Sequence, residues 1–240
     1  MATHQEQAVI DLREMILTGV LGAGQRVTET ALTAMLNISR TPVRYALTAL
    51  SQEGLLTSLG KRGYVVSTFR VEDVLGAIDV RGALEGLAAR TIAECGLAPE
   101  LRRQLGACLA SGDALFAKGH LVPGDAARYS EMNRTFHDLI TDASGNDALV
   151  HLLGINSSVP FSAAGAFAFD QAGLDFQYRT LNYAHMQHHA IVQALEQGEG
   201  ARAEALMREH TNAAKGSLSM DNESFVANGA ATLPGHRGAP

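Results

Sequence analysis

Residues 39–54 read SRTPVRYALTALSQEG, and this stretch decides the fold of the first part of the chain. Thr41 followed by Pro42 predicts a helix start, with Thr41 as the N-cap and proline at the first helical position. The apolar residues that follow at helical spacing are Val43, Ala46, Leu47 and Leu50. This spacing places them on one face of a helix, which Gly54 ends.

The opposite face of this helix carries groups that can contact a nucleic acid. If the apolar stripe is buried, Arg44 and Tyr45 must point outward. Arg40 and Thr41 stand at the helix N-terminus, where free backbone N–H groups and the helix dipole favour a phosphate.

Two further helices are predicted before it. Apolar residues at helical spacing between Val9 and Ile16 indicate the first, and Thr28 is a good N-cap for a second helix over 29–36. Residues 37–39 form a short turn between the second and third helices. Two short helices joined by such a turn are typical of a helix-turn-helix, whose second helix enters the major groove of DNA.

A β-hairpin with a basic tip is predicted after the third helix. Residues 55–59 and 64–68 are strand-like, and they flank Gly60, Lys61, Arg62 and Gly63. A hairpin of this kind is the usual form of a wing, which lies along a DNA backbone or reaches into a minor groove.

Charge is distributed unevenly along the chain. Residues 1–70 contain seven Lys and Arg against five Asp and Glu, whereas residues 71–240 contain twelve against twenty. The first part is therefore expected to meet a polyanion. The chain of 240 residues is 46% hydrophobic, which excludes disorder over most of its length. It shows neither a signal peptide nor the roughly 20 apolar residues of a membrane span, so a cytoplasmic location is expected.

The segment from Leu12 to Val66 resembles the winged helix-turn-helix of the GntR family of bacterial transcription regulators. The resemblance is carried by Ser39-Arg40-Thr41-Pro42-Val43-Arg44, Glu53-Gly54-Leu55-Leu56 and Arg62-Gly63-Tyr64. It implies that Arg40, Thr41 and Arg44 contact phosphates and base edges, and that Gly60 and Lys61 approach the minor groove. Tyr45 stands where the family usually has Glu, and Thr30 where a basic residue is common, so the base preference does not transfer.

The second part of the chain has helical spacing and no strand alternation. Its predicted helices span residues 74–93, 99–118, 125–143, 147–155, 174–197 and 201–215. The chain is therefore expected to be mostly α, with a winged helix-turn-helix over 1–70 and an all-helical bundle over 71–215. Residues 216–240 are rich in Gly, Ser, Asn, Ala and Pro and are expected to be a disordered tail.

Histidines are numerous, with nine in the chain. His137 lies four residues after Asn133, so both point from the same helix face and could chelate one ion. His188 and His210, on two consecutive helices, can be brought opposite His137 inside a bundle. Imidazole nitrogens suit Zn²⁺, Ni²⁺ or Fe²⁺. Each histidine could instead be a hydrogen-bonded core or surface residue.

Arg81 lies in the middle of a helix among apolar neighbours, where an unpaired guanidinium is costly, so it needs a carboxylate partner. Glu85 or Asp79 could supply one within the chain. The alternative is that Arg81 clamps the carboxylate of a small acid.

Parts of this second region resemble the FadR-type C-terminal (FCD) effector domain. The segments that carry the resemblance are residues 78–88, 133–137, 188–191 and 207–210. Many members of that group hold a metal with Asp-x-x-x-His and two later histidines, which implies Asn133, His137, His188 and His210 as ligands or effector contacts here. Because Asn133 replaces the Asp, the site would have three imidazoles and no carboxylate charge, and a lower metal affinity.

The region is also similar to the vanillate-responsive repressors of this group. Residues 79–96, 160–166 and 184–188 carry this similarity. It implies an aromatic acid as effector, held by Arg81 in a flat pocket that Phe161, Phe167 and Phe169 could line. These phenylalanines could equally be ordinary core residues.

The sequence thus predicts a homodimeric bacterial regulator, most simply a repressor, that binds a palindromic DNA operator and is released by a small carboxylic acid. One divalent metal ion per subunit is the expected cofactor. A regulator that senses the metal itself is the first alternative. A metal-dependent enzyme is disfavoured, because no general base such as the Glu of H-E-x-x-H is present.

Overall fold

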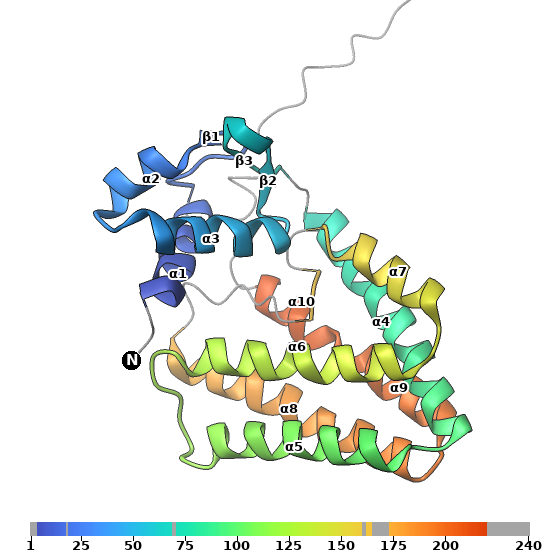
Figure 1. The fold of residues 1–240 in the computed structure, drawn as a ribbon. Helices are drawn as coiled ribbons and strands as arrows, with labels where there is room; N and C mark the ends of the chain where they lie inside the picture. Colours follow the sequence, from blue (N-terminus) through green and yellow to red (C-terminus); the bar gives the residue numbers. More distant parts are fainter. Residues whose placement is uncertain (1–3, 18, 69–70, 160–161, 165–172, 220–240) are drawn as a thin grey trace, which may run out of the picture.

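The computed structural model describes residues 4–17, 19–68, 71–159, 162–164 and 173–219. Among them, three helices and a small sheet come first (Figure 1). These elements are α1 (His4–Leu17), β1 (Arg26–Val27), α2 (Glu29–Leu36), α3 (Arg40–Gln52), β2 (Leu56–Ser58), a 3-10 turn (Gly60–Arg62) and β3 (Tyr64–Val66). The predicted helix-turn-helix and wing are therefore present, and the chain is mostly helical, as predicted.

The start of α3 differs from the prediction. Ser39 is the N-cap, Arg40 is the first helical residue and Pro42 is the third. Proline is tolerated there because the first four N–H groups of a helix have no partner within it. The predicted cap of α2 is confirmed, since the Thr28 side chain accepts a hydrogen bond from the Ala31 N–H.

The wing contains a strand that the sequence analysis missed. β3 lies in the centre of an antiparallel sheet, between β2 and the two-residue β1. Gly63 enables this pairing, because its φ is +95° and a Cβ there would lie 2.6 Å from the Val27 carbonyl oxygen. Glycine is the residue that tolerates both conditions.

Seven helices follow in the described residues. They are α4 (Val71–Cys95), α5 (Pro99–Phe116), α6 (Asp125–Ala143), α7 (Asp147–Asn156), α8 (Leu174–Glu196), α9 (Gly200–His210) and α10 (Asn212–Ser219). The helix predicted over 201–215 is divided at Thr211, whose hydroxyl donates to the Arg208 carbonyl. The predicted tail starts at residue 216, but α10 continues to Ser219. Residues 220–240 lie outside the described part of the chain.

Two glycines on α4 bring α9 close to it. A Cβ at Gly82 would lie 2.8 Å from the Thr211 hydroxyl oxygen, and one at Gly86 would lie 3.1 Å from the Glu204 carbonyl oxygen. Larger side chains would push the two helices apart. α9 therefore runs along α4 (Figure 1). His210, the last residue of α9, is buried.

The described residues form two hydrophobic cores. One lies between α4, α5, α6, α8 and α9, and the other between α1, α2, α3 and the sheet. Val74 and Ile78 of α4 and Ala214 of α10 pack in the second of these, the N-terminal core. The packing therefore crosses the predicted boundary at residue 70, and α4 belongs to both cores. No helix among the described residues is long and apolar enough to cross a membrane.

Candidate functional site

The predicted DNA-contacting residues are all exposed, on α3 and in the turn of the wing. Arg40, Thr41 and Arg44 are exposed on α3, and Tyr45 is half exposed. Gly60, Lys61 and Arg62 are exposed in the turn between β2 and β3. Burial of the apolar residues Val43, Ala46, Leu47 and Leu50 produces this arrangement, as the sequence predicted.

Arg44 is held by a partner that the sequence analysis did not identify. Its Nε and Nη2 atoms donate to the two Glu29 carboxylate oxygens at 2.9 Å each. The side-chain hydrogen bond from Arg44 lowers the pKa of Glu29. Such a two-point contact fixes the guanidinium in one orientation. Glu29 is at the first position of α2, fifteen residues before Arg44, so only the packing of the two helices brings them together.

Tyr45 faces the second part of the molecule. A hydrogen bond with Glu131 raises the pKa of Arg134, and the Tyr45 phenol adds to this effect. This face of α3 therefore lies toward α6 in the structure.

The three predicted histidines meet in the core of the helical bundle. His137 of α6, His188 of α8 and His210 of α9, called the inner triad below, are each at most 4% exposed. The His210 Nε2 atom lies 3.2 Å from Nε2 of His137 and 3.0 Å from Nε2 of His188. Metal–nitrogen bonds of about 2.0–2.1 Å in a tetrahedron place ligand atoms about 3.3 Å apart. The inner triad is therefore close to the spacing that a metal ion needs.

The far sides of two of these rings face oxygen atoms. Nδ1 of His137 lies 2.9 Å from Glu85 Oε2, and Nδ1 of His210 lies 3.2 Å from Gln187 Oε1. Oxygen neighbours favour a proton on each Nδ1, which leaves a lone pair on each Nε2. Burial and the neighbouring histidines lower the pKa of His188, and burial with His137 and Arg81 lowers that of His210, so both rings are neutral at pH 7. Converging lone pairs in an apolar core fit a cation.

Asn133 lies one turn before His137 and is buried. Its amide nitrogen donates to the Ala164 carbonyl, while its Oδ1 has no hydrogen-bond partner in the described residues. A buried acceptor without a donor is costly, and a metal ion would satisfy it. The donor set therefore suits a divalent ion, with three imidazole nitrogens and one amide oxygen available.

Arg81 and Glu85 are buried beside this set and pair with each other, which was one of the alternatives from the sequence. Arg81 Nε lies 3.6 Å from Glu85 Oε2, and Arg81 Nη1 donates to the Ser162 carbonyl at 2.7 Å. Burial raises the pKa of Glu85, but the neighbouring His137 ring and the Arg81 guanidinium outweigh it, so the pKa is lowered and the carboxyl is ionised. The other alternative partner, Asp79, pairs with Lys215 instead.

Glu85 changes the charge expected for the inner triad. From the sequence, the site would have three imidazoles and no carboxylate. The structure places a carboxylate directly behind His137. A carboxylate on the far nitrogen of a ligand histidine orients the ring and makes it a stronger donor. The spacing of Arg81 and Glu85, one turn apart on α4, indicated from the sequence that the two side chains could pair. It could not show that His137 faces the same carboxylate.

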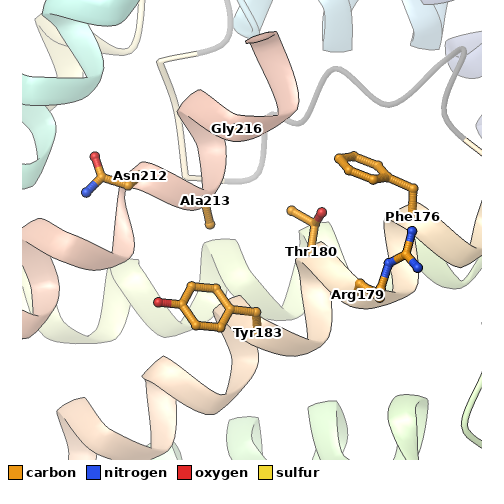
Figure 2. Close-up of a pocket in the computed structure, with 7 residues that line it drawn as sticks. All are labelled: Phe176, Arg179, Thr180, Tyr183, Asn212, Ala213 and Gly216. Atoms are coloured by element: carbon orange, nitrogen blue, oxygen red, sulfur yellow. The ribbon is translucent and has the colours of Figure 1, made fainter. Parts of the chain in front are cut away.

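The predicted aromatic pocket is not among the features that the structure describes. Phe161, Phe167 and Phe169 lie outside the described residues. Figure 2 shows a shallow hollow of about 340 Å³ between α8 and α10. Its lining residues are Phe176, Arg179, Thr180, Tyr183, Asn212, Ala213 and Gly216. None of the predicted effector contacts that the structure describes lines this hollow, so it gives no support to the predicted effector site.

Two family models match the chain. Residues 4–66 match the model described as bacterial regulatory proteins, gntR family, and residues 77–213 match the FCD domain. The gntR match covers α3 and the wing, and the FCD match covers the inner triad.

Named relatives are transcriptional regulators. The chain is 29% identical over 198 residues to a probable D-xylose utilization operon transcriptional repressor from Paenarthrobacter nicotinovorans, a match that covers 82% of this chain and 81% of the relative. It is 29% identical over 212 residues to the HTH-type transcriptional regulator LutR from Bacillus subtilis, over 82% of this chain and 92% of the relative. A match to the Bacillus subtilis HTH-type regulator YdhC, 29% identical over 142 residues, spans 59% of this chain and 61% of that protein.

Solved structures share the fold. E. coli McbR/YncC has a TM-score of 0.55 at 20% identity, with 94% of this chain and 100% of that chain covered. Lar, which controls the expression of the Listeria monocytogenes agr system, has a TM-score of 0.57 at 15% identity, with 94% and 98% covered. At these identities the similarity concerns the fold alone.

Proposed function

Because the chain belongs to the GntR family of bacterial regulatory proteins and carries an FCD domain, we propose that it is a homodimeric repressor released from a palindromic operator by a small carboxylic acid. It is a transcriptional regulator rather than an enzyme, in line with its family and relatives. The observation that carries the proposal is that the inner triad is buried beside Arg81 and Glu85 of α4. α4 is also the helix that packs in the N-terminal core.

Residues 1–70 form the DNA-reading part in this proposal. α3 enters the major groove, so that Arg40, Thr41 and Arg44 meet phosphates and base edges. Tyr45, which is near Arg134 of α6 in this structure, joins them when α3 turns away from α6. Lys61 and Arg62 of the wing contact the backbone beside the minor groove. Glu29 supports this role, because it holds the Arg44 guanidinium in one orientation before DNA arrives. In this proposal the protein binds DNA in the bacterial cytoplasm.

A second copy of the chain covers an exposed seam of α4. Gly76, Val80, Ala83 and Leu87 are all exposed, and their spacing of four, three and four residues places them on one helix face. Val80 and Leu87 are 50% and 45% exposed, so the seam presents large apolar side chains to solvent. Pairing two such seams would bury them and hold two copies of α3 at a fixed separation, as a palindromic operator requires.

The inner triad, with Asn133 as a possible fourth donor, holds one divalent ion such as Zn²⁺, Ni²⁺ or Fe²⁺ per subunit. When bound, the ion supplies a positive centre that attracts an anion. Arg81 adds a guanidinium whose Nε has no hydrogen-bond partner among the described residues. A carboxylic acid, in our proposal an aromatic one of the vanillate type, binds with its carboxylate toward Arg81. Phe161 is the proposed aromatic neighbour.

Effector and DNA are coupled through α4. Arg81 follows Ile78 by three residues, and Ile78 packs in the N-terminal core. A second route runs through α6, where Arg134 is near Tyr45 and Asn133 is beside the inner triad. The acid is expected to bind the conformation in which the two copies of α3 are misplaced for their DNA half-sites, so acid binding lowers the affinity for DNA. DNA binding then lowers the affinity for the acid by the same factor.

Two variants separate the DNA-reading part from the effector site. In mobility-shift assays, Arg44→Ala should weaken operator binding at least about tenfold, while acids still raise its melting temperature. Arg81→Ala should bind operator but lose the acid-induced stabilisation. Arg103→Ala, which removes an exposed arginine of α5 that pairs with Glu100, serves as the control. Equal loss of both functions in either variant would contradict the division of roles.

A panel of acids tests the effector class. Benzoate-type, aliphatic hydroxy and sugar acids are compared by thermal shift and by release of operator DNA. Stabilisation by sugar acids alone would refute the aromatic assignment.

The convergence of the inner triad also favours a second candidate, a regulator that senses the metal ion. Removal and return of metal in the operator assay distinguishes the two. Release by an organic acid at constant metal supports effector sensing, whereas release by metal or chelator alone supports the metal sensor.

A further inference from the structure

A second group of metal-ligating side chains lies outside the inner triad, between α5 and α8. It consists of Asp113, His185 and His189, called the outer triad below. His185 and His189 are one turn apart on α8, and each places its Nε2 atom on Asp113 Oδ1 of α5, at 3.0 and 2.9 Å. The three ligand atoms lie within 4.8 Å of one another.

The position of His185 is built into the packing of the two helices. The side chain is 1% exposed, and its ring lies against Phe116 with 5.5 Å between centroids. Gly112 leaves the space for this ring, because a Cβ there would lie 2.2 Å from His185 Cε1. Any other residue at position 112 would displace the imidazole. The ring is therefore held before any ion binds.

In the described part of the chain, the hydrogen-bonding groups of the outer triad are incompletely paired. If both Nε2 atoms donate to the same carboxylate oxygen, each Nδ1 is left with a lone pair. Nδ1 of His185 is buried and makes no hydrogen bond of normal geometry in the described part of the chain, although the ring also interacts with the Leu109 backbone. A metal ion bound to Asp113 Oδ1 and to the two Nε2 atoms would take the place of the two hydrogen bonds that now share Oδ1. The proton of each neutral imidazole would then lie on Nδ1.

The surroundings of the outer triad admit an ion from solvent. The Asp113 side chain is 56% exposed and that of His189 is 36% exposed. Their ligand atoms need to separate by only a few tenths of an ångström to reach the spacing of about 3.3 Å in a tetrahedral site. Exposed side chains can make this adjustment. Two imidazoles and one carboxylate, with a remaining position open to water, suit first-row divalent ions such as Zn²⁺, Ni²⁺ or Cu²⁺.

We propose that Asp113, His185 and His189 form a second site for a divalent transition metal, separate from the inner triad. The bound ion joins α5 to α8 at the surface of the bundle. The two sites differ in ligand type, because this one contains a carboxylate and an open position while the inner triad is buried and made of imidazoles.

Zinc titration of the full-length, untagged, metal-free protein tests this proposal. Bound Zn²⁺ per protomer is measured by equilibrium dialysis at matched free Zn²⁺ in the wild type, in His189→Ala and in the control His151→Ala. His151 is exposed on α7 and belongs to neither triad. His189→Ala should bind one ion fewer per protomer than both the wild type and His151→Ala. This difference does not depend on whether the inner triad is occupied.

Equal zinc binding by the wild type and His189→Ala would overturn the proposal. Asp113→Asn provides a second variant, because its side chain is also exposed and its loss should not affect folding. It should weaken the outer site at least about tenfold while leaving the remaining bound zinc unchanged. A wild type that binds no more than one ion, with His137→Ala and not His189→Ala removing it, would also overturn the second site.

Discussion

Replacement of Glu85 by glutamine should destabilise the helical domain strongly. The side chain is 3% exposed, and the Arg81 side chain that it neutralises is 4% exposed. Glutamine keeps the volume and removes the charge, so that Arg81 is left with a buried positive charge and the Ser162 carbonyl as its partner. Removing one partner of a buried ion pair costs about 3–5 kcal/mol.

The expected change in melting temperature follows from the size of the chain. One kcal/mol corresponds to about 2–4 °C in a protein of 150–250 residues, so Glu85→Gln should lower the melting temperature by about 6–20 °C. Differential scanning calorimetry of the metal-free protein measures it. Glu94→Gln is the matched control, because Glu94 pairs with Arg90 on the same helix but is 53% exposed. Exposed pairs contribute about 0–1 kcal/mol, so the control should shift by less than about 4 °C.

A shift in Glu85→Gln as small as that of Glu94→Gln would refute the reasoning. It would mean that Glu85 does not compensate the charge of Arg81, and that another group does. The metal-binding role of Glu85 is then measured separately. If the carboxylate orients His137, zinc affinity at the inner triad should fall about 10–100-fold in Glu85→Gln.

Three further predictions concern the DNA surface, the dimer and the pH dependence. Glu29→Gln should weaken DNA binding about two- to threefold, because Glu29 holds the Arg44 guanidinium in one orientation before DNA arrives; stronger binding in a fluorescence-anisotropy titration at low salt would show that the negative charge of Glu29 instead opposes the phosphates. Leu87→Glu should convert a dimer to a monomer, as measured by the mass in light scattering. Val122→Glu changes an exposed residue outside α4 and should leave the dimer intact. An unchanged mass for Leu87→Glu would place the interface elsewhere. Burial raises the pKa of Asp125, but hydrogen bonds from Lys118 and the Val122 N–H outweigh it and lower the pKa below 3.8. The Asp125 carboxylate therefore stabilises the fold above its usual pKa and loses this effect as pH falls through its lowered pKa. Asp125→Asn should be about 1–3 kcal/mol less stable than the wild type in urea at pH 7, and the difference should be smaller at pH 2. An equal difference at both pH values would contradict this assignment.

The order of elements in the DNA-reading part could be predicted because each depends on local chemistry. The Thr28 cap and the apolar stripes are properties of short segments, and the structure contains them at the predicted places. The strand Arg26–Val27 could not be predicted, because two residues have no periodicity and pair only through β3. The close approach of Thr211 to Gly82 could not be predicted either, because the two residues are remote in sequence.

The inner triad was predictable in part. Spacing relates Asn133 to His137, and a bundle can bring His188 and His210 opposite them, so the residue types and helices were available from sequence. The role of Glu85 was not, because it faces Arg81 one turn away and His137 across the bundle at the same time. The outer triad joins Asp113 to two histidines more than 70 residues later, and nothing local relates them.

What the sequence by itself determined is therefore the kind of each element and the side chains it exposes or buries, since helical periodicity, caps and charge act over a few residues. Only the tertiary structure decided which charged groups meet: Arg44 with Glu29, Arg81 with Glu85, and Asp113 with its two imidazoles. These pairings join different helices or depend on how deeply a helix is buried. They follow from the packing of complete apolar faces against one another, to which residues throughout the chain contribute.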